Sequence, residues 1–540
     1  MKKHARKLFN VHSGEERKAM LFALLGFVLS LAVSSAWKLS DALFLIHLGS
    51  DLLPQAYACT AILLIAMALV LLNAFNRYSP TSIFRGLVMG GMSLFAAISA
   101  SFWLGFDKTH PWFWFVLKVL SQLFFFQSIS CFWTALDQFV HFQDAKRLFT
   151  LFNCSIYIGT ALSGLLIQSG MIPVHGFFTM IFMLWCAVFV LSNKISSFQP
   201  AVCELEADST PESSLLAVAK QILSSPFTLL LMLGNLMLYL LMTTTEYNYF
   251  RIFEEHFITQ KELLQDESAY SLTRFMGTCI ASVGLGNLIM GWFLYSRFVA
   301  RFGVTSLLLI TPVAYLTTYL GWPLDTSMLC AILGFVIVEG LYPVIDDNNF
   351  NLLLNAVPKK IKYKVRVMIE SFSEPVGMLL SALLLSLPMV NNYTLGLVLS
   401  CIALLLALML RKGYFQAIFS NLSGTKEWLK SFFKKGRIES EQQLLELVRQ
   451  SDPKMQLLAF RACIYSDNLP LLKMALAECS HLETATRIEL LHLLDRSPYR
   501  ASNAISESIL AWQEQDADLD LMAAIKWYIA KCPFETRLVT

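Results

Sequence analysis

Twelve apolar runs, each about as long as a bilayer is thick, constrain what this 540-residue chain can fold into. Crossing the hydrocarbon core takes roughly 20 mostly apolar residues in a helix, because a backbone in lipid must satisfy its own hydrogen bonds. The sequence therefore predicts an all-α polytopic membrane protein. The runs lie at residues 20–37, 53–75, 83–106, 112–136, 149–168, 174–192, 226–248, 273–296, 302–321, 327–345, 366–387 and 391–411.

Charged residues are sparse and unevenly placed. They make up 15% of the chain and the net charge is only +3, which excludes a disordered chain and a nucleic-acid-binding protein. Beyond residue 411 their share rises to about 25%, as in a soluble domain, whereas before it the share is about 12%. No cysteine pair has zinc-site spacing and there is no Walker motif. We therefore expect no metal, no cofactor and no enzymatic activity.

Lysine and arginine gather in the loops on one side of the predicted membrane. With twelve helices both termini lie on the same side, and the loops there carry Arg77, Lys146, Arg147, Arg301 and Arg366 besides the basic N-terminal segment. The opposite loops carry few basic residues. Because basic loops remain in the cytoplasm, we expect both termini to be cytoplasmic.

A weak internal repeat spans the polar segment 193–225, which separates six runs from six. The stretch that begins at Arg77 is echoed at Arg301, 224 positions later, and Gly159 with its neighbours is echoed at Gly377, 218 positions later. Each echoed pair falls on one membrane side, which predicts two parallel six-helix repeats. This plan resembles that of the major facilitator superfamily.

These features divide the chain into six parts. We expect a cytoplasmic N-terminal segment (1–19), an N-terminal six-helix bundle (20–192), a cytoplasmic linker (193–225), a C-terminal six-helix bundle (226–411), an amphipathic linker (412–435) and a cytoplasmic soluble α-helical repeat domain (436–540). In the last part short helical patterns alternate with brief breaks, as in HEAT-like repeats. We interpret it as a binding or regulatory module for a protein partner; the alternative is a cap that only stabilises the protein.

Polar side chains within the apolar runs are the candidates for a substrate site. A charged group costs roughly 2.5–3.5 kcal/mol at mid-membrane, so it needs a partner or a wet cavity. Residues three or four apart share a helix face and can turn together toward such a cavity. The candidate substrate-binding residues are Lys38 with Asp41, Lys118 with Gln122, Glu246, Glu339, and Glu370 with Glu374.

Most of these candidates have a simpler alternative explanation. Lys38, Asp41 and Glu246 fall near the predicted ends of their runs and would be solvated at the membrane surface. Lys118 would extend its ammonium to that surface, and Glu370 would pair with a basic residue at the start of its run. The carboxylates of Glu339 and Glu374 are harder to explain without a function.

Three segments carry a resemblance to a known family. DALFL at 41–45, FWTALDQ at 132–138 and DAKRLF at 144–149 are similar to the first loop, the FW-x-x-AN segment and the EAKR loop of the bacterial and plastid ATP/ADP translocase family. The resemblance extends diffusely over about residues 20–410, and some relatives carry HEAT-like C-terminal extensions. It implies exchange of ATP for ADP and phosphate across a bacterial inner membrane. The chain departs from the family at Ser40, where a second basic residue is typical, and at Asp137, where asparagine is typical.

Our leading interpretation is a secondary transporter of nucleotides or related anionic metabolites that works by alternating access. Lys38 and Lys118 would face the substrate anions. A gate on the side of the termini would use Asp137, Lys146, Arg147, Arg77, Arg301 and Arg366.

Two alternatives remain open. Carboxylates outnumber basic groups among the candidates, which suits a proton-coupled facilitator of a zwitterionic or cationic metabolite better than a carrier of a tetra-anion. The other is a membrane scaffold or sensor that acts through its C-terminal domain.

Overall fold

The computed structural model describes residues 16–531 apart from several gaps. The gaps are at 76, 107–109, 111, 141, 196–197, 199–224, 260–264, 323–327, 358–364, 367–368, 388–390, 424–444, 447, 450–452, 466–468, 496, 498–502 and 516–517. Every regular element in this part of the chain is a helix, which confirms the predicted all-α class.

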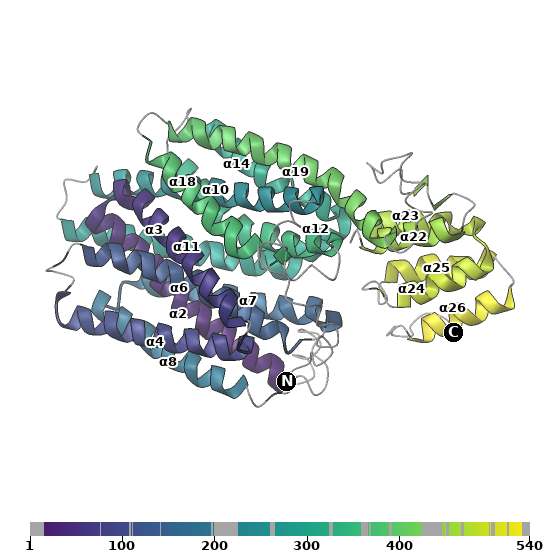
Figure 1. Cartoon of the computed structure of the whole chain (residues 1–540), viewed down its shortest axis with the longest axis horizontal. Coiled ribbons are helices and arrows are strands. Elements are labelled where there is room, and N and C mark those ends of the chain that lie inside the picture. The colour runs from purple at the N-terminus through teal and green to yellow at the C-terminus, as the bar shows by residue number, and fades with distance from the viewer. Residues whose placement is uncertain are drawn as a thin grey trace.

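Two groups of helices form the apolar part of the molecule (Figure 1). The first contains α2 (Glu16–Leu48), η1 (Ser50–Leu52), α3 (Leu53–Phe75), α4 (Pro80–Trp103), α6 (Trp112–Asp137), α7 (Phe142–Ser169) and α8 (Val174–Lys194). The second contains α10 (Pro226–Glu254), η3 (Glu255–Thr259), α11 (Gln265–Ile289), η4 (Met290–Leu294), α12 (Tyr295–Phe302), α13 (Val304–Leu307), α14 (Ile310–Gly321), α15 (Met328–Val336), η5 (Ile337–Asp346), α16 (Asp347–Leu353), η6 (Leu354–Ala356), η7 (Ile369–Ser373), α18 (Glu374–Leu385) and α19 (Asn392–Ser423).

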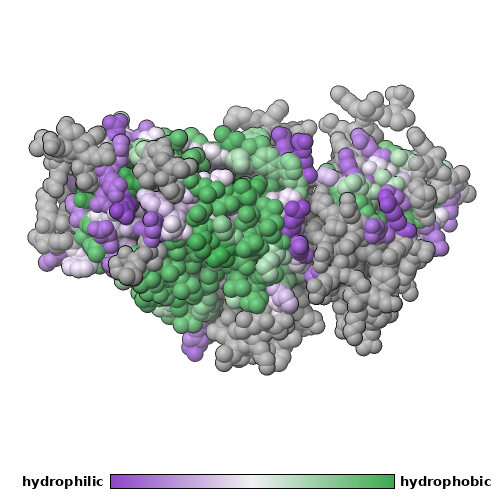
Figure 2. All heavy atoms as spheres, turned by 90° about the horizontal axis from the view of Figure 1, so that it is seen from above, coloured by the Kyte–Doolittle hydropathy of each residue, from purple (hydrophilic) through white to green (hydrophobic). Residues whose placement is uncertain are grey.

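Eleven helical stretches in the described residues are long and apolar enough to cross a membrane. The shorter apolar helix α18, preceded by η7, occupies the place of the eleventh predicted run. Figure 2 shows a continuous hydrophobic face over the bundle, with hydrophilic residues toward both ends. On α14 and α19 this face exposes Val313, Leu320, Val398 and Leu405. Such a broad apolar surface is what lipid contact requires.

The first helix of each half forms the centre of the molecule. In α2 the stretch 29–45 is buried on every side, and in α10 the stretch 239–250 is buried in the same way. A helix that is apolar on only one face cannot be enclosed like this. Both helices also continue past their predicted ends at residues 37 and 248, so the polar residues near those ends lie inside helices and not in loops.

The two halves pack in the same way. Gly159 of α7 lies against the backbone of α2, where an added Cβ would come 2.6 Å from the carbonyl oxygen of Phe27. Gly377 of α18 lies against the backbone of α10, where an added Cβ would come 2.7 Å from the carbonyl oxygen of Leu236. Glycine permits such close approach of two helices. The echoed glycines therefore hold equivalent helix pairs together.

Contacts between the halves are also equivalent. Helix α7 of the first half packs on α11 of the second, and α18 of the second half packs on α3 of the first. Helices α7 and α18 occupy corresponding places in the two halves, and so do α3 and α11. The α7–α11 pair therefore corresponds to the α18–α3 pair. This is the arrangement expected of two repeats related by an axis along the membrane normal.

Four π-helical segments lie among the described residues of the second half: η3, η4, η5 and η7. In η5, Pro343 lies within the helix and has no backbone N–H to donate. A π-helical stretch in a membrane helix is tolerated where neighbouring groups satisfy the freed backbone. Such segments frequently mark functional sites.

Among the described residues, five further helices follow the apolar part. They are α22 (Pro453–Tyr465), α23 (Leu469–Ala477) with η8 (Glu478–His481), α24 (Thr484–Asp495), α25 (Asn503–Gln515) and α26 (Leu519–Lys531). They lie at the same end of the bundle as the start of α2 (Figure 1). Helix α22 contacts α19, and α23 contacts α12. Helix α19 continues to Ser423, so the segment predicted as a linker from residue 412 begins as part of a long helix.

Candidate functional site

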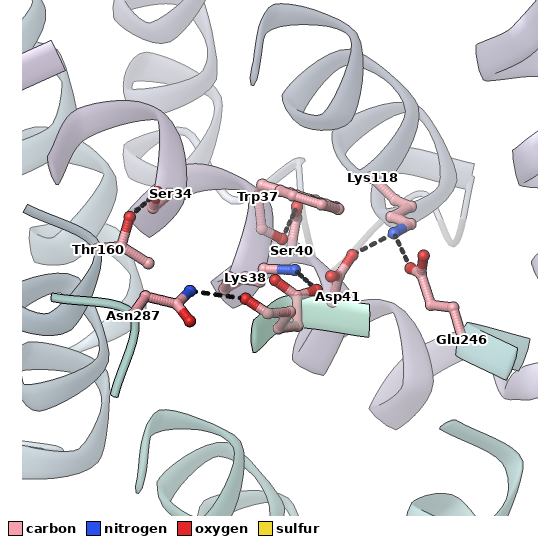
Figure 3. A network of polar contacts seen from close by, with 10 residues as sticks. Ser34, Trp37, Lys38, Ser40, Asp41, Lys118, Thr160, Glu246 and Asn287 are labelled. Atoms are coloured by element: carbon pink, nitrogen blue, oxygen red, sulfur yellow. Dashed lines mark hydrogen bonds and ion pairs between the residues drawn. The ribbon is translucent and has the colours of Figure 1, made fainter. Parts of the chain in front are cut away.

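Lys118 of α6 is the centre of a buried ion network between the halves. Its ammonium forms an ion pair with Asp41 of α2 and lies 3.7 Å from the carboxylate of Glu246 of α10. Figure 3 shows Lys118 between these two carboxylates. The first pair joins two helices of one half, whereas the second joins the two halves.

A second ion pair crosses between the halves beside the first. The Lys38 ammonium lies 2.5 Å from the Glu339 carboxylate on η5. The same ammonium lies 3.4 Å from the ring centroid of Trp37, within cation–π range. Asn287 of α11 donates a hydrogen bond of 2.8 Å to the backbone carbonyl of Glu339. This carbonyl belongs to the π-helical segment, so the irregular backbone is fixed next to the ion pair.

These positions exclude the simpler explanations for four of the candidates. Lys38, Asp41, Lys118 and Glu246 are each at most 3% exposed, so none is solvated at a surface and Lys118 does not extend to one. The two lysines also face carboxylates in this conformation, and not an open anion site. Together with Glu339 the network has three carboxylates and two ammonium groups, which leaves one negative charge if all are ionised.

Several polar groups around the network lack hydrogen-bond partners within the described residues. Both amide atoms of Gln122, one turn from Lys118, are buried and unpaired. The same holds for the Trp37 indole nitrogen and for the hydroxyls of Tyr57 and Tyr249. Burying such a group without a partner costs about 1–3 kcal/mol. The site therefore has spare donors and acceptors on an aromatic wall.

Glu374 and Glu370 are the remaining candidates. Glu374 lies beside the hydroxyls of Tyr239 and Tyr342, which are themselves joined by a hydrogen bond of 2.6 Å. Glu370 lies in η7, and its side chain is outside the described residues. The role of these two glutamates in a substrate site stays a prediction.

At the end of the bundle near the termini, one predicted pair of gate residues meets. Arg366 lies 3.7 Å from Asp137 across the halves, with both side chains partly exposed. Arg77 and Arg301 are exposed at the ends of their helices. The side chains of Lys146 and Arg147 lie outside the described residues. The role of these residues in a gate stays a prediction.

At the opposite end of the bundle, a contact that the sequence analysis did not anticipate joins the two halves. The Ser50 backbone N–H donates a hydrogen bond of 2.7 Å to the carboxylate of Glu254, at the end of α10. Gly49 has a φ of +79°, and an added Cβ there would come 2.8 Å from the same carboxylate. We refer to Gly49, Ser50 and Glu254 as the far-end clasp. It joins the α2–α3 connection of one half to the second half.

The sequence analysis missed several residues of these sites, for two reasons. Glu254 and Asp346 lie just beyond the predicted ends of their apolar runs and so were treated as loop residues. Trp37, Tyr57 and Tyr249 are aromatic residues among many others, and nothing in the sequence distinguishes them. An ionisable residue within two turns of a predicted helix end is the signal that would have identified the first two.

Solved structures share this fold. The crystal structure of the nucleoside transporter NupG matches with a TM-score of 0.51 and 13% identity, over 74% of this chain and 99% of that one. The crystal structure of a D-xylose-proton symporter matches with a TM-score of 0.51 and 13% identity, over 73% and 96%. No known protein family matches the sequence, and no curated protein matches it significantly. The apolar part therefore has a major facilitator-like fold.

Proposed function

We propose that the chain is a secondary transporter that works by alternating access and carries a small polar metabolite across the membrane. The observation that carries this proposal is the pair of buried ionic contacts between the halves, Lys38 with Glu339 and Lys118 with Glu246. Desolvating such groups costs several kcal/mol per ion, which well-packed apolar residues would avoid. Ionisable residues retained inside a membrane domain are therefore best explained by function.

The position of these contacts supports a role in the transport cycle. They cross the interface along which two repeats rock against each other in alternating access. Opening either end pulls the halves apart there, so each ammonium must exchange its carboxylate for water, substrate or another carboxylate. Lys118 already lies between two carboxylates, Asp41 and Glu246, and can change partner by a small movement.

Charge balance supports an uncharged, zwitterionic or cationic substrate. When all its groups are ionised, the network has a net charge of −1. A nucleotide with four negative charges would add to this negative charge. A proton taken up by one of the carboxylates would remove it, which supports proton coupling. The unpaired groups of Trp37, Gln122, Tyr57 and Tyr249 supply donors and acceptors for a polar ring or hydroxylated molecule. Nucleosides and D-xylose, the molecules named for the two fold neighbours, are of this kind.

Nucleotide exchange is the second candidate. It follows from the resemblance to the ATP/ADP translocase family, and one observation favours it. Lys38 and Lys118 lie side by side on the same network, both near Asp41. If the carboxylates were protonated, these two ammonium groups would become a phosphate site. The same bacterial inner-membrane location applies to either candidate.

Counterflow into proteoliposomes separates these possibilities. Vesicles preloaded with one unlabelled compound are given the same compound in labelled form, for a panel of sugars, nucleosides, amino acids, amines, ATP and ADP. We expect exchange of an uncharged, zwitterionic or cationic member and none of ATP or ADP, with protein-free vesicles as control. Exchange of ATP and ADP alone would favour the second candidate. No exchange across the panel would favour a scaffold or sensor that acts through the C-terminal helices.

A further inference from the structure

A buried carboxyl in the second half takes no part in the network described above. Asp346 lies where η5 ends and α16 begins, and it is 6% exposed. Its Oδ2 atom has no hydrogen-bond partner, and within the described residues the side chain has no ion pair. An ionised carboxylate in such a place is strongly unfavourable, so the group needs either a ligand or a proton.

The Asp346 carboxyl lines a cavity of about 50 Å³ among α10, α14, α16 and α19. This volume has room for one or two water molecules. Apolar side chains make up most of its wall, and Asn235 is the other polar side chain. The cavity therefore offers water access to the carboxyl but few oxygen ligands. The wall includes Leu231, Leu308, Pro312, Phe350, Leu353 and Leu410.

Hydroxyl groups on one face of α14 lead from this cavity toward the central network. Thr311 faces the Asp346 carboxyl, and Tyr315, one turn further along, lies in the same buried region as Asp346 and Glu339. The hydroxyls of Thr311 and Tyr315 are buried, and neither has a partner in hydrogen-bonding geometry. Residues four apart share a helix face, so the two hydroxyls lie on the same side of α14.

We propose that Asp346 is a proton-binding site of the second half, supplied with water through its cavity and connected by Thr311 and Tyr315 to the Glu339–Lys38 ion pair. A proton suits the donor set better than a metal ion. Hard cations such as Ca²⁺ take six to eight oxygen ligands, whereas in the described part of the chain the cavity wall offers the side-chain oxygens of Asp346 and Asn235, with Thr311 facing Asp346. The proton binds Oδ2, the oxygen that no donor contacts. This removes the negative charge from an oxygen that has nothing to stabilise it.

The titratable groups described around Asp346 carry no positive charge. Asp347 is adjacent on the same chain segment and adds negative charge. Within the described residues, Tyr315 from α14 and Tyr342 from η5 are the other titratable groups near the Asp346 carboxyl. All three are acidic side chains, so none supplies the positive charge that would hold the carboxylate ionised. Only the use of this proton in transport rests on the proposed function; the binding itself does not.

Infrared spectroscopy of the full-length protein in detergent tests this directly, because a protonated carboxyl has a carbonyl band that a carboxylate lacks. We expect wild type at neutral pH to have a component of this band that Asp346→Asn removes. Glu255→Gln, which removes an exposed carboxylate elsewhere in the protein, should retain it. Thr311→Val keeps the size of the side chain and should shift the same component, which provides a test if Asp346→Asn does not fold.

Two results would overturn the proposal. A carboxyl band that is identical in wild type, Asp346→Asn and Thr311→Val would show that Asp346 is ionised. A rise in melting temperature on adding Na⁺ to wild type, lost in Asp346→Asn, would show that the site holds a metal ion instead. Neither readout needs a transported substrate, so failure here is distinct from failure of the counterflow experiment.

Discussion

Lys118 forms an ion pair with Asp41 from a neighbouring helix, and neither side chain is exposed to solvent. Glu246 of the other half lies 3.7 Å from the same ammonium. One ammonium group therefore interacts with two carboxylates that belong to different halves of the molecule. Removing the ammonium leaves both carboxylates buried and unpaired, and this has consequences for stability that can be measured.

We predict that Lys118→Gln lowers the free energy of unfolding by about 3–5 kcal/mol, the usual cost of breaking a buried ion pair from one side. Adding Asp41→Asn should recover part of this loss, because it removes one of the carboxylates left behind. Denaturation of the purified protein gives the double-mutant cycle. Lys194→Gln, an exposed lysine at the end of α8, is the control and should change little. Strictly additive effects of the two network substitutions would contradict the pairing.

Gly159→Ala and Gly377→Ala should each destabilise the protein by about 1–3 kcal/mol. The added methyl would lie 2.6 and 2.7 Å from backbone carbonyl oxygens, so the helices must move apart. Gly234→Ala is the matched control, because an added Cβ there has no neighbour within 4 Å. Melting temperatures of the three variants provide the test. A loss at only one of the two echoed glycines would argue against equivalent packing in the two halves.

Glu254→Gln should weaken the far-end clasp. A hydrogen bond to a charged group contributes about 1.5–3 kcal/mol, so exchange of the Ser50 amide hydrogen should become roughly 10- to 150-fold faster. Hydrogen–deuterium exchange of the peptide that contains Ser50 measures this. Glu255→Gln is the control, since that carboxylate is exposed and pairs with Arg251 on its own helix. Unchanged exchange in the first variant would show that Glu254 does not hold this end closed.

Residues 436–540 should fold when expressed alone, as their charge density predicts. Cys479 provides a sensitive reporter, because it is fully buried and burial raises the pKa of its thiol. A thiol in this state reacts slowly with alkylating reagents. We expect helical circular dichroism and slow alkylation that becomes fast in denaturant. An aggregated fragment would show that the contacts of α22 with α19 and of α23 with α12 are needed for folding.

Much of the architecture follows from local patterns in the sequence. Apolar runs predict membrane helices because lipid leaves the backbone no other partner. The echo of Gly159 at Gly377 predicted two parallel repeats, since close helix packing requires the same small residue in each. Helix ends were less well predicted, because α2 and α10 continue as helices where their sequences turn polar.

The pairing within the site did not follow from the sequence. Spacing placed Lys38 with Asp41 on one helix face, yet Lys38 pairs with Glu339, which is 301 positions away. Such a contact depends on how the two halves meet, and no periodicity in a single helix encodes it. For the same reason the sequence indicated an anion site at Lys118, whereas the fold places two carboxylates there.

The most direct test of alternating access locks the far-end clasp. Cysteines replace Ser50 and Glu254, and counterflow of the compound found in the panel is measured before and after treatment with a short bis-methanethiosulfonate cross-linker, which joins the two thiols through disulfide bonds. Ser50→Cys alone is the control. We predict exchange in the reduced protein, a fall to the level of protein-free vesicles once the clasp is cross-linked, and recovery with reductant. Full exchange through the cross-linked protein would contradict the account, because the far end would then not need to open.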